Sequence, residues 1–194
     1  MHASPDKIEI RPGGPDDVPA VLAMFDSAVR WLVARGRTGQ WGDQPRSTEP
    51  GMIDRIESWA RAGELHLACL DGRPIGALGV GAALPYVPAV DEPEVYVRLL
   101  ITDRAYAGRQ VGARLLDHAR ENARARGVDL LRVDCYGGDD RALVRYYERQ
   151  GFTPTVPFTV DTPRGPWLGQ VLEQRLHRTR GDGGEPTVGS ASTS

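Results

Sequence analysis

The sequence predicts a mixed α/β domain built around one sheet. The chain has 194 residues, enough for one domain with a full core and too few for two ordinary domains. Its apolar positions recur with helical spacing in some segments and alternate in others, and two of the alternating segments flank a tight turn. Segments of both kinds interleave along the chain, which is typical of a single sheet flanked by helices.

The first third of the chain predicts a strand and two helices. Residues 7–11 alternate like a strand. A helix then begins near Pro15, a residue that suits the first turn, and ends at Gly36. A second helix over residues 50–62 places its large apolar residues on one face.

The middle of the chain predicts three strands. Residues 64–70 and 74–82 are strand-like and flank Asp71-Gly72-Arg73, a signal for a β-hairpin. Residues 94–101 form the next strand. The rest alternates between the two kinds of element: a helix over 106–126, a strand over 129–136, a helix over 140–150, and strands over 152–160 and 168–176.

The last residues differ from the rest of the chain. Residues 177–194 contain one branched aliphatic residue, Val188, among many Gly, Ser and Thr. Such a segment cannot bury enough apolar surface to offset its ordering entropy. We therefore expect one folded domain over residues 5–176 and a disordered tail over 177–194.

Charge and composition exclude several classes of protein. Lys and Arg total 24 against 26 Asp and Glu, so the net charge of -2 leaves no positive excess for nucleic acid or a membrane surface. The N-terminus lacks an apolar signal region, and the longest nearly apolar run, residues 77–90, is too short to span a bilayer. We expect a cytoplasmic protein.

The two cysteines, Cys69 and Cys135, both lie in apolar runs. They are expected to be small buried hydrophobic residues rather than a disulfide. With two Cys and four scattered His, no spacing typical of a metal site is present.

Residues 99–116 contain a strand end, a short loop and the start of a helix. A helix N-terminus offers unpaired backbone N–H groups and a partial positive charge, which suit a phosphate if the backbone is uncovered. Gly108 and Gly112 would uncover it, and Arg109 and Arg114 would add positive charge. The segment is neither a nucleotide P-loop nor a dinucleotide fingerprint. An ordinary loop with glycines that make room for packing is the alternative.

A second segment, residues 139–154, is a short helix that ends at Gly151 and is followed by Phe152. Together the two segments resemble the GNAT superfamily of N-acetyltransferases, which bind acetyl-coenzyme A. The family's cofactor motif falls on residues 107–112. Its second motif falls on Asp140, Leu143, Tyr147, Glu148, Gly151 and Phe152, and the resemblance covers residues 7–176 in order.

The resemblance implies a sheet of about seven strands flanked by four helices and splayed between the fourth and fifth strands. It also implies acetyl-CoA as co-substrate, with no metal. The residues expected to contact it are Leu99, Leu100, Ile101, Ala107, Gly108, Arg109, Gln110, Val111, Gly112, Ala113, Asp140, Leu143 and Tyr146.

Four positions depart from the family pattern. Ala107 replaces Gln or Arg, Gln110 replaces the first motif glycine, Asp140 replaces Asn and Leu143 replaces a small residue. Backbone N–H groups survive the first two changes. An ionised Asp140, however, cannot donate a hydrogen bond.

Acetyl transfer needs a base for the ammonium, donors for the oxyanion and a donor for the departing thiolate. The resemblance assigns the last role to Tyr147 and the oxyanion to the backbone of residues 99–101. Strand alternation puts Glu94, Tyr96, Arg98 and Leu100 on one face, and Val95, Val97, Leu99 and Ile101 on the other. Glu94 is the candidate base, with Asp134 or a water chain as alternatives, whereas His66 and His118 are expected to be structural.

The acceptor site is expected near the segment between the first two helices. Trp31 and Trp41 bracket that segment and could line an acceptor pocket, although Trp31 also has the spacing of a core residue. Arg98 either pairs with an acidic neighbour or holds a substrate carboxylate in a bidentate clamp.

The expected activity is direct transfer of acetyl from acetyl-CoA to a primary amine of a small molecule. Two alternatives remain open: a non-catalytic acyl-CoA-binding or regulatory module, and an acetyltransferase that acts on a protein or peptide amine. The expected protein is a monomer or homodimer, without nucleic acid or membrane partners.

Overall fold

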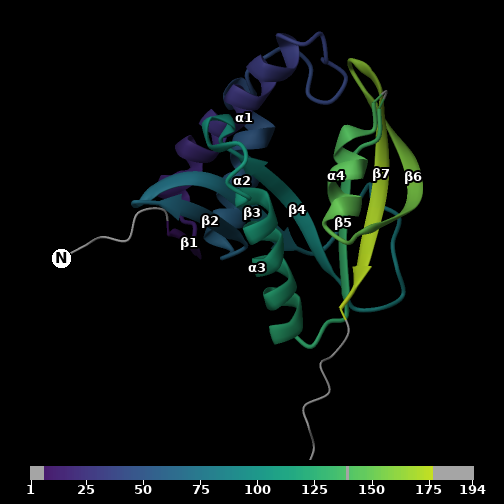
Figure 1. Ribbon diagram of the computed structural model, residues 1–194. Coiled ribbons are helices and arrows are strands. Elements are labelled where there is room, and N and C mark those ends of the chain that lie inside the picture. The colour runs from purple at the N-terminus through teal and green to yellow at the C-terminus, as the bar shows by residue number, and fades with distance from the viewer. Residues whose placement is uncertain (1–6, 139, 177–194) are drawn as a thin grey trace, which may run out of the picture.

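The predicted periodicities correspond to helices and strands in a computed structural model that describes residues 7–138 and 140–176 (Figure 1). The strands are β1 (Ile8–Pro12), β2 (Leu65–Leu70), β3 (Arg73–Gly81), β4 (Val95–Thr102), β5 (Leu130–Tyr136), β6 (Thr153–Thr162) and β7 (Gly165–Arg175). The helices are α1 (Val18–Val33), α2 (Pro50–Arg61), α3 (Val111–Ala125) and α4 (Ala142–Arg149). The tail predicted over 177–194 lies outside the described residues.

The strands form one mixed sheet in the order β1-β2-β3-β4-β5-β7-β6. β4 and β5 pair in parallel, and the other described pairs are antiparallel. The predicted hairpin joins β2 to β3 through Asp71 and Gly72, whose φ angles of 49° and 78° belong to the turn that favours Asp-Gly. The predicted fold class is confirmed.

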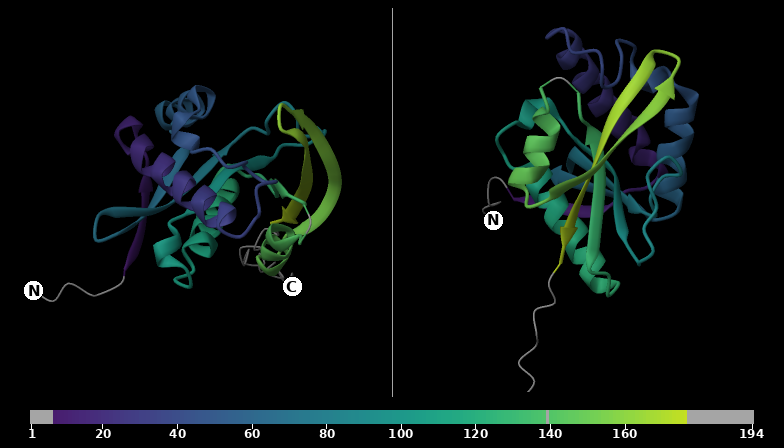
Figure 2. Two further views of the ribbon diagram at one scale, coloured as in Figure 1. Left: turned by 90° about the horizontal axis from the view of Figure 1, so that it is seen from above. Right: turned by 90° about the vertical axis from the view of Figure 1, so that its right-hand side faces the viewer.

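Helices cover both faces of the sheet (Figure 2). One core cluster lies under α1 and α2 and includes Phe25, Ile56 and Trp59. The other lies under α3 and α4 and includes Leu115 and Tyr147. Because α3 and α4 share one cluster, they cover the same face, and α1 and α2 cover the opposite one.

β4 and β5 separate soon after they meet. Their pairing joins Val95–Val97 to residues 131–133 and then ends, whereas β5 stays paired with β7 as far as Tyr136. The two strands diverge in Figure 1. The predicted splay is therefore confirmed, and the edge of β4 beyond Val97 has no strand partner on the side of β5.

The strict alternation predicted for residues 94–101 is wrong beyond Arg98. On β3, Gly79 pairs with Leu99 and its neighbour Val80 with Val97, so Arg98 is an extra residue that forms a β-bulge. Val95 and Val97 pack under α3, but Leu99 packs under α1 and α2. One inserted residue thus turns the later side chains to the opposite face.

The helix predicted to begin at Tyr106 begins instead at Val111. The carboxylate of Asp103 accepts a hydrogen bond from the Ala105 N–H at 2.9 Å and caps a separate short turn over Arg104–Tyr106. This local bond competes with helix formation. Residues 107–110 are left as a loop.

Two histidines meet between β2 and α3. His118 Nε2 lies 3.1 Å from His66 Nδ1, and the Nε2 of His66 is buried without a hydrogen-bond partner among the described residues. Burial, together with the charges of His118 and Arg126, lowers the pKa of His66 to about 4. The fold therefore holds His66 neutral, which agrees with its predicted structural role.

This pair predicts a loss of stability in mild acid. The unfolded chain protonates His66 near its ordinary pKa of about 6.5, whereas the folded chain resists until about pH 4. The free energy of unfolding should fall as the pH drops from 6.5 to 4, and His66→Gln should flatten that slope. Urea melts at several pH values measure it, and an unchanged slope in the variant would contradict the prediction.

Candidate active site

Asp134 lies at the point where β4 and β5 part. It follows Val133, the last residue of β5 that pairs with β4. The hydroxyl of the fully buried Tyr96 donates a 2.7 Å hydrogen bond to Asp134 Oδ1. Burial raises the pKa of Asp134 above its ordinary value, although the hydrogen bond from Tyr96 opposes the shift. A carboxylate with a raised pKa in this place can accept a proton.

Glu94, the first candidate base, has another partner. Arg132 is buried on β5, and its Nη1 lies 3.0 Å from Glu94 Oε2. The Nη2 of Arg132 donates to the Pro88 carbonyl at 2.9 Å. A guanidinium so deeply buried requires a carboxylate to offset its desolvation. The geometry thus gives Glu94 a structural task and favours Asp134 among the predicted alternatives.

Tyr147 lies on the other side of the parted strands, in the core cluster under α3 and α4. Its hydroxyl makes no hydrogen bond to any residue in the described ranges. Burial raises the pKa of Tyr147 well above its ordinary value, so the phenol stays protonated. Burial also raises the pKa of the nearby Cys135 thiol to about 12, which makes that cysteine a poor nucleophile.

The loop before α3 leaves its backbone uncovered. The first helical hydrogen bond runs from the Arg114 N–H to the Gln110 carbonyl at 3.1 Å, so the preceding N–H groups are not used within the helix. Gly108 has a φ of +86°, and a Cβ there would meet nothing within 4 Å. Exposed backbone donors at the positive end of a 15-residue helix fit a phosphate. The residues present therefore suit the pyrophosphate of coenzyme A.

Gln110 occupies a backbone conformation that favours glycine. Its φ of 57° and ψ of 25° lie in the left-handed region, where a side chain costs about 1 kcal/mol or more. The family motif has a glycine at this position. Gln110 replaces that glycine here but keeps the backbone conformation that a glycine would adopt. Gly112 has a different role: a Cβ there would collide with the Tyr146 hydroxyl, so any side chain would force that ring to shift.

The side chains of the other predicted cofactor residues lie on both sides of the sheet, because Leu99 and Ile101 pack under α1 and α2. Val111 is buried in the core under α3 and α4, and Leu143 packs against the same cluster. Asp140 is engaged by the chain itself: it accepts a hydrogen bond from the Ala142 N–H at 3.0 Å and pairs with Arg37 at 2.7 Å. Asp140 thereby fastens α4 to the segment that follows α1.

Arg98 is bound to an acidic neighbour, the first of its two predicted roles. Its Nη1 pairs with Glu64, and its Nε donates to the Ala82 carbonyl at 2.6 Å. The guanidinium also lies 5.9 Å from the Trp59 ring. These contacts hold the bulge of β4 in place.

The two tryptophans predicted to line an acceptor pocket do not come together. Trp41 packs against Phe25 in the core, with ring centroids 5.3 Å apart. Trp31 has the guanidinium groups of Arg35 and Arg104 at 4.1 and 3.5 Å from its ring centroid. Nothing in these contacts turns either indole toward Asp134.

A different set of aromatic residues runs from the Asp134 side of the site to the β6–β7 hairpin, and the sequence analysis missed it. Tyr86, Phe158, Trp167 and Tyr136 form a row in which each ring centroid lies 5.9 Å from the next. The charge of Asp134 helps to raise the pKa of Tyr86, so this end of the row lies near the carboxylate. No local sequence signal indicates the row, because the hairpin must fold back to assemble it.

The segment between α1 and α2 crosses to this hairpin. The indole N–H of Trp167 donates to the Gln40 carbonyl at 3.0 Å, and Arg164 pairs with Glu49 at 3.5 Å. A Cβ at Gly39 would collide with the Tyr136 hydroxyl, so that glycine permits the close approach of the segment to Tyr136. We call residues 36–49 the strap.

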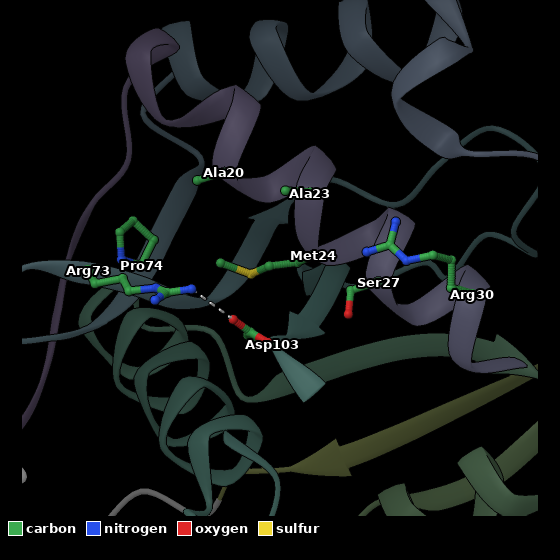
Figure 3. A pocket seen from close by; sticks show the side chains of 8 residues that line it. All are labelled: Ala20, Ala23, Met24, Ser27, Arg30, Arg73, Pro74 and Asp103. Carbon is green, nitrogen blue, oxygen red and sulfur yellow. Dashed lines mark ion pairs between the residues drawn. The ribbon is translucent and has the colours of Figure 1, made fainter. Parts of the chain in front are cut away.

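A hollow of about 340 Å³ lies elsewhere, between α1 and the ends of β3 and β4 (Figure 3). Its lining includes Met24, Ser27 and Arg30 of α1 and the ion pair of Arg73 with Asp103, at 3.8 Å. It contains none of the predicted site residues. A hollow of about 330 Å³ between the hairpin and the start of α4 is lined by Arg141, Phe158 and Gln170, among others.

The described part of the chain contains no helix long and apolar enough to cross a membrane. Over the same residues, no group of three or more His, Cys, Asp or Glu side chains is placed to hold a metal ion. Both cysteines are buried and free.

Comparison with known proteins agrees with this geometry. The sequence model described as the Acetyltransferase (GNAT) family matches residues 28–152, more than half of the chain. A search of curated proteins finds no match.

Solved structures share the fold at low sequence identity. Ribosomal-protein-alanine N-acetyltransferase from Brucella melitensis is 23% identical, with a TM-score of 0.63 over 87% of this chain and 99% of that one. The yncA protein from Salmonella typhimurium, solved with its cofactor acetyl-CoA, is 19% identical, with a TM-score of 0.62 over 91% and 98%. Polyamine N-acetyltransferase from Drosophila melanogaster is 16% identical, with a TM-score of 0.60 over 88% and 100%.

The loop before α3, residues 107–110, is called the α3 loop below. Its backbone conformation predicts opposite effects on stability for two substitutions. Gln110→Gly should raise the free energy of unfolding by up to about 1 kcal/mol, because it relieves a left-handed side-chain position. Gly108→Ala should lower it by about 1 kcal/mol, since it creates such a position. Chemical denaturation measures both, and equal signs for the two variants would refute the strain argument.

Proposed function

Because the chain belongs to the GNAT family of acetyltransferases, we propose that it transfers the acetyl group of acetyl-CoA directly to a primary amine of a small molecule. The parted strands carry this proposal. They leave the edge of β4 uncovered, with Asp134 on the side of the aromatic row and Tyr147 on the side of α3 and α4. A base and a hydrogen-bond donor thus lie on opposite sides of one backbone edge.

Asp134 takes the proton that the ammonium must lose before the amine can attack the thioester. Its raised pKa makes it a stronger base than an ordinary carboxylate, which suits this task. The proton ends on the carboxylate, and the amine nitrogen forms its bond to the acetyl carbon.

Backbone N–H groups of Leu99–Ile101 stabilise the oxyanion of the tetrahedral intermediate. Tyr147 then donates a hydrogen bond to the sulfur as the carbon–sulfur bond breaks. Its raised pKa means that the phenol stabilises the departing thiolate without giving up its own proton. The nitrogen is cationic after the attack, and its second proton leaves as the intermediate collapses and neutralises the thiolate to give the thiol of coenzyme A. The first proton stays on Asp134 until it is released to solvent.

The α3 loop holds the pyrophosphate of acetyl-CoA, with the pantetheine arm along the open edge of β4. Gly108 keeps the backbone accessible, and the N–H groups of residues 110–113 provide the hydrogen bonds. When bound, acetyl-CoA supplies the activated acetyl group.

The position of the strap favours a small-molecule amine over a protein as the acceptor. The bond of Trp167 to Gln40 ties the strap to the hairpin, and the ion pair of Arg37 with Asp140 ties it to the segment before α4. These contacts join the strap to the Trp167 end of the aromatic row, on the side of the sheet where Asp134 lies. A segment fixed there is the reason we favour a small acceptor over a folded protein.

The first experiment is a thiol-release assay of the purified protein with acetyl-CoA and a broad panel of small amines. Release that depends on one amine supports the proposal, and mass spectrometry identifies the acetylated product. Binding of acetyl-CoA by calorimetry without turnover would favour the non-catalytic module instead. Absence of both binding and turnover would exclude the two functions together.

Tyr147→Phe should separate binding from chemistry. The ring is retained in the core, so acetyl-CoA should bind with unchanged affinity, while kcat falls by about 10²-fold, the typical effect of losing one donor to a developing charge. Calorimetry and steady-state kinetics measure the two effects. An unchanged kcat would remove Tyr147 from the mechanism.

With Asp134 as the base, the pH profile of kcat/KM should have an acid limb. Activity should fall as the pH drops through the pKa of Asp134, which lies above the ordinary carboxyl value. The hydrogen bond from Tyr96 stabilises the charged carboxylate, so Tyr96→Phe should move that limb to higher pH. Asp134→Asn should lower kcat by about 10²-fold or more.

Glu94→Gln is the matched control for this profile. It removes a carboxylate from the same region and leaves the buried Arg132 without its ion pair, so it should lower stability. It should leave the position of the acid limb unchanged. A limb that vanishes in Glu94→Gln and persists in Asp134→Asn would assign the base to Glu94.

A further inference from the structure

Tyr146 of α4 reaches across the cofactor side of the sheet to α3. On this face α3 lies mainly over β3 and β4, and α4 lies over β5 and β7, so the parted strands run between the two helices (Figure 1). A Cβ at Gly112, in the first turn of α3, would collide with the Tyr146 hydroxyl. The side chain therefore bridges the two halves of the sheet.

The hydroxyl lies beside the backbone donors at the start of α3. Because a Cβ lies about 2.5 Å from the nitrogen of its own residue, a hydroxyl that collides with the Cβ position of Gly112 lies within about 5 Å of the Gly112 N–H. Thr102, the last residue of β4, approaches the same position, with its Cγ2 at 3.9 Å from it. The hydroxyl thus lies where a ligand held by α3 would pass to the open edge of β4.

The ring of Tyr146 is held in place, and its hydroxyl is unused. The ring packs against the core cluster under α3 and α4, and its centroid lies 5.3 Å from that of Tyr147. The hydroxyl forms no hydrogen bond with any residue in the described ranges. Burial raises the pKa of Tyr146, so the phenol keeps its proton. A protonated phenol without a protein partner can donate a hydrogen bond to a ligand.

One phosphate group can accept from both the hydroxyl and the backbone. Hydrogen bonds are about 2.9 Å long from an N–H and about 2.7 Å long from a hydroxyl, so one phosphate can bridge two donors that lie about 5 Å apart. The Tyr146 hydroxyl and the Gly112 N–H meet this condition. A bond from a hydroxyl to a charged phosphate oxygen is also stronger than one between neutral groups.

We propose that the Tyr146 hydroxyl donates a hydrogen bond to the pyrophosphate of coenzyme A, beside the bonds from the N–H groups of α3. The inference rests on the proposed function and adds a side-chain donor to its cofactor site. The bound pyrophosphate is then held from both α3 and α4. The two adjacent tyrosines have separate tasks: Tyr146 binds the cofactor, and Tyr147 acts on the departing sulfur.

Calorimetry with coenzyme A tests the role of the hydroxyl. Tyr146→Phe keeps the ring and should weaken binding about tenfold, the usual effect of losing one hydrogen bond to a charged group. The KM for acetyl-CoA should rise by a similar factor. Tyr147→Phe is the matched control, because it removes a phenol hydroxyl from the next residue of the same helix and should keep the affinity. Equal affinities of wild type and Tyr146→Phe, or equal losses in the two variants, would overturn the proposal.

Ligands that share parts of coenzyme A locate the bond. Dephospho-coenzyme A lacks only the ribose phosphate, and adenosine diphosphate lacks the pantetheine arm as well. Tyr146→Phe should weaken the binding of both by the same factor as that of coenzyme A, with the nucleotide measured by its displacement of coenzyme A. A loss confined to coenzyme A would place the bond on the ribose phosphate. A loss that spares adenosine diphosphate would place it on the pantetheine arm, and failure of the nucleotide to displace coenzyme A would show that the pyrophosphate is not held. Each of these outcomes would overturn the proposal.

Thermal unfolding without cofactor tests the position of the hydroxyl. Tyr146→Phe alone should not lower the Tm, because the hydroxyl has no partner in the free protein. Gly112→Ala should lower the Tm of the wild type, since its methyl group collides with the hydroxyl. It should lower the Tm less in the Tyr146→Phe background, where the nearest ring carbon of that side chain lies 3.4 Å away. Equal losses in both backgrounds would overturn the proposal.

The same measurements separate this inference from the proposed function. A wild type that binds no coenzyme A would overturn the acetyltransferase and the role of Tyr146 together. A wild type that binds coenzyme A and acetylates an amine, with unchanged affinity in Tyr146→Phe, would overturn the role of Tyr146 alone.

Discussion

The short contact between β4 and β5 is the constraint on which the site depends. Three residue pairs hold the two halves of the sheet together before the strands part, and the bulge at Arg98 lies immediately beyond the last pair. A longer ladder would use the backbone groups of β4 that an acyl donor requires. The contacts of Arg98 with Glu64 and Ala82 fix the bulge and hence the course of the open edge.

Burial gives the two proposed catalytic groups their different properties. Desolvation disfavours the charged form of both, so it raises the pKa of Asp134 toward the range of a useful base and keeps Tyr147 protonated as a donor. The sheet separates the groups onto opposite sides. Arg132 is buried next to the point where β4 and β5 part, and Glu94, which directly precedes β4, is its ion-pair partner. This pairing is why we propose Asp134 rather than Glu94 as the base.

The acceptor side combines segments that are distant in the sequence. The strap after α1, the loop that carries Tyr86 and the β6–β7 hairpin meet through the bond of Trp167 to Gln40, the aromatic row and the ion pair of Arg164 with Glu49. The cofactor side, by contrast, is built from one continuous loop and two helix starts. This difference agrees with a fold that keeps its acyl donor and varies its acceptor.

The sequence by itself determined the order of elements, the hairpin at Asp71-Gly72 and the glycine-containing loop before α3, because these depend on local periodicity, turn chemistry and backbone conformation. It also indicated Tyr147, through the resemblance of a short motif. It could not determine the base, the direction of side chains beyond Arg98 or the lining of the acceptor side. Those depend on a single-residue bulge, on the choice of Arg132 as the partner of Glu94 and on a hairpin that folds back over the sheet. Long-range pairing decides each of these, and no local pattern records it.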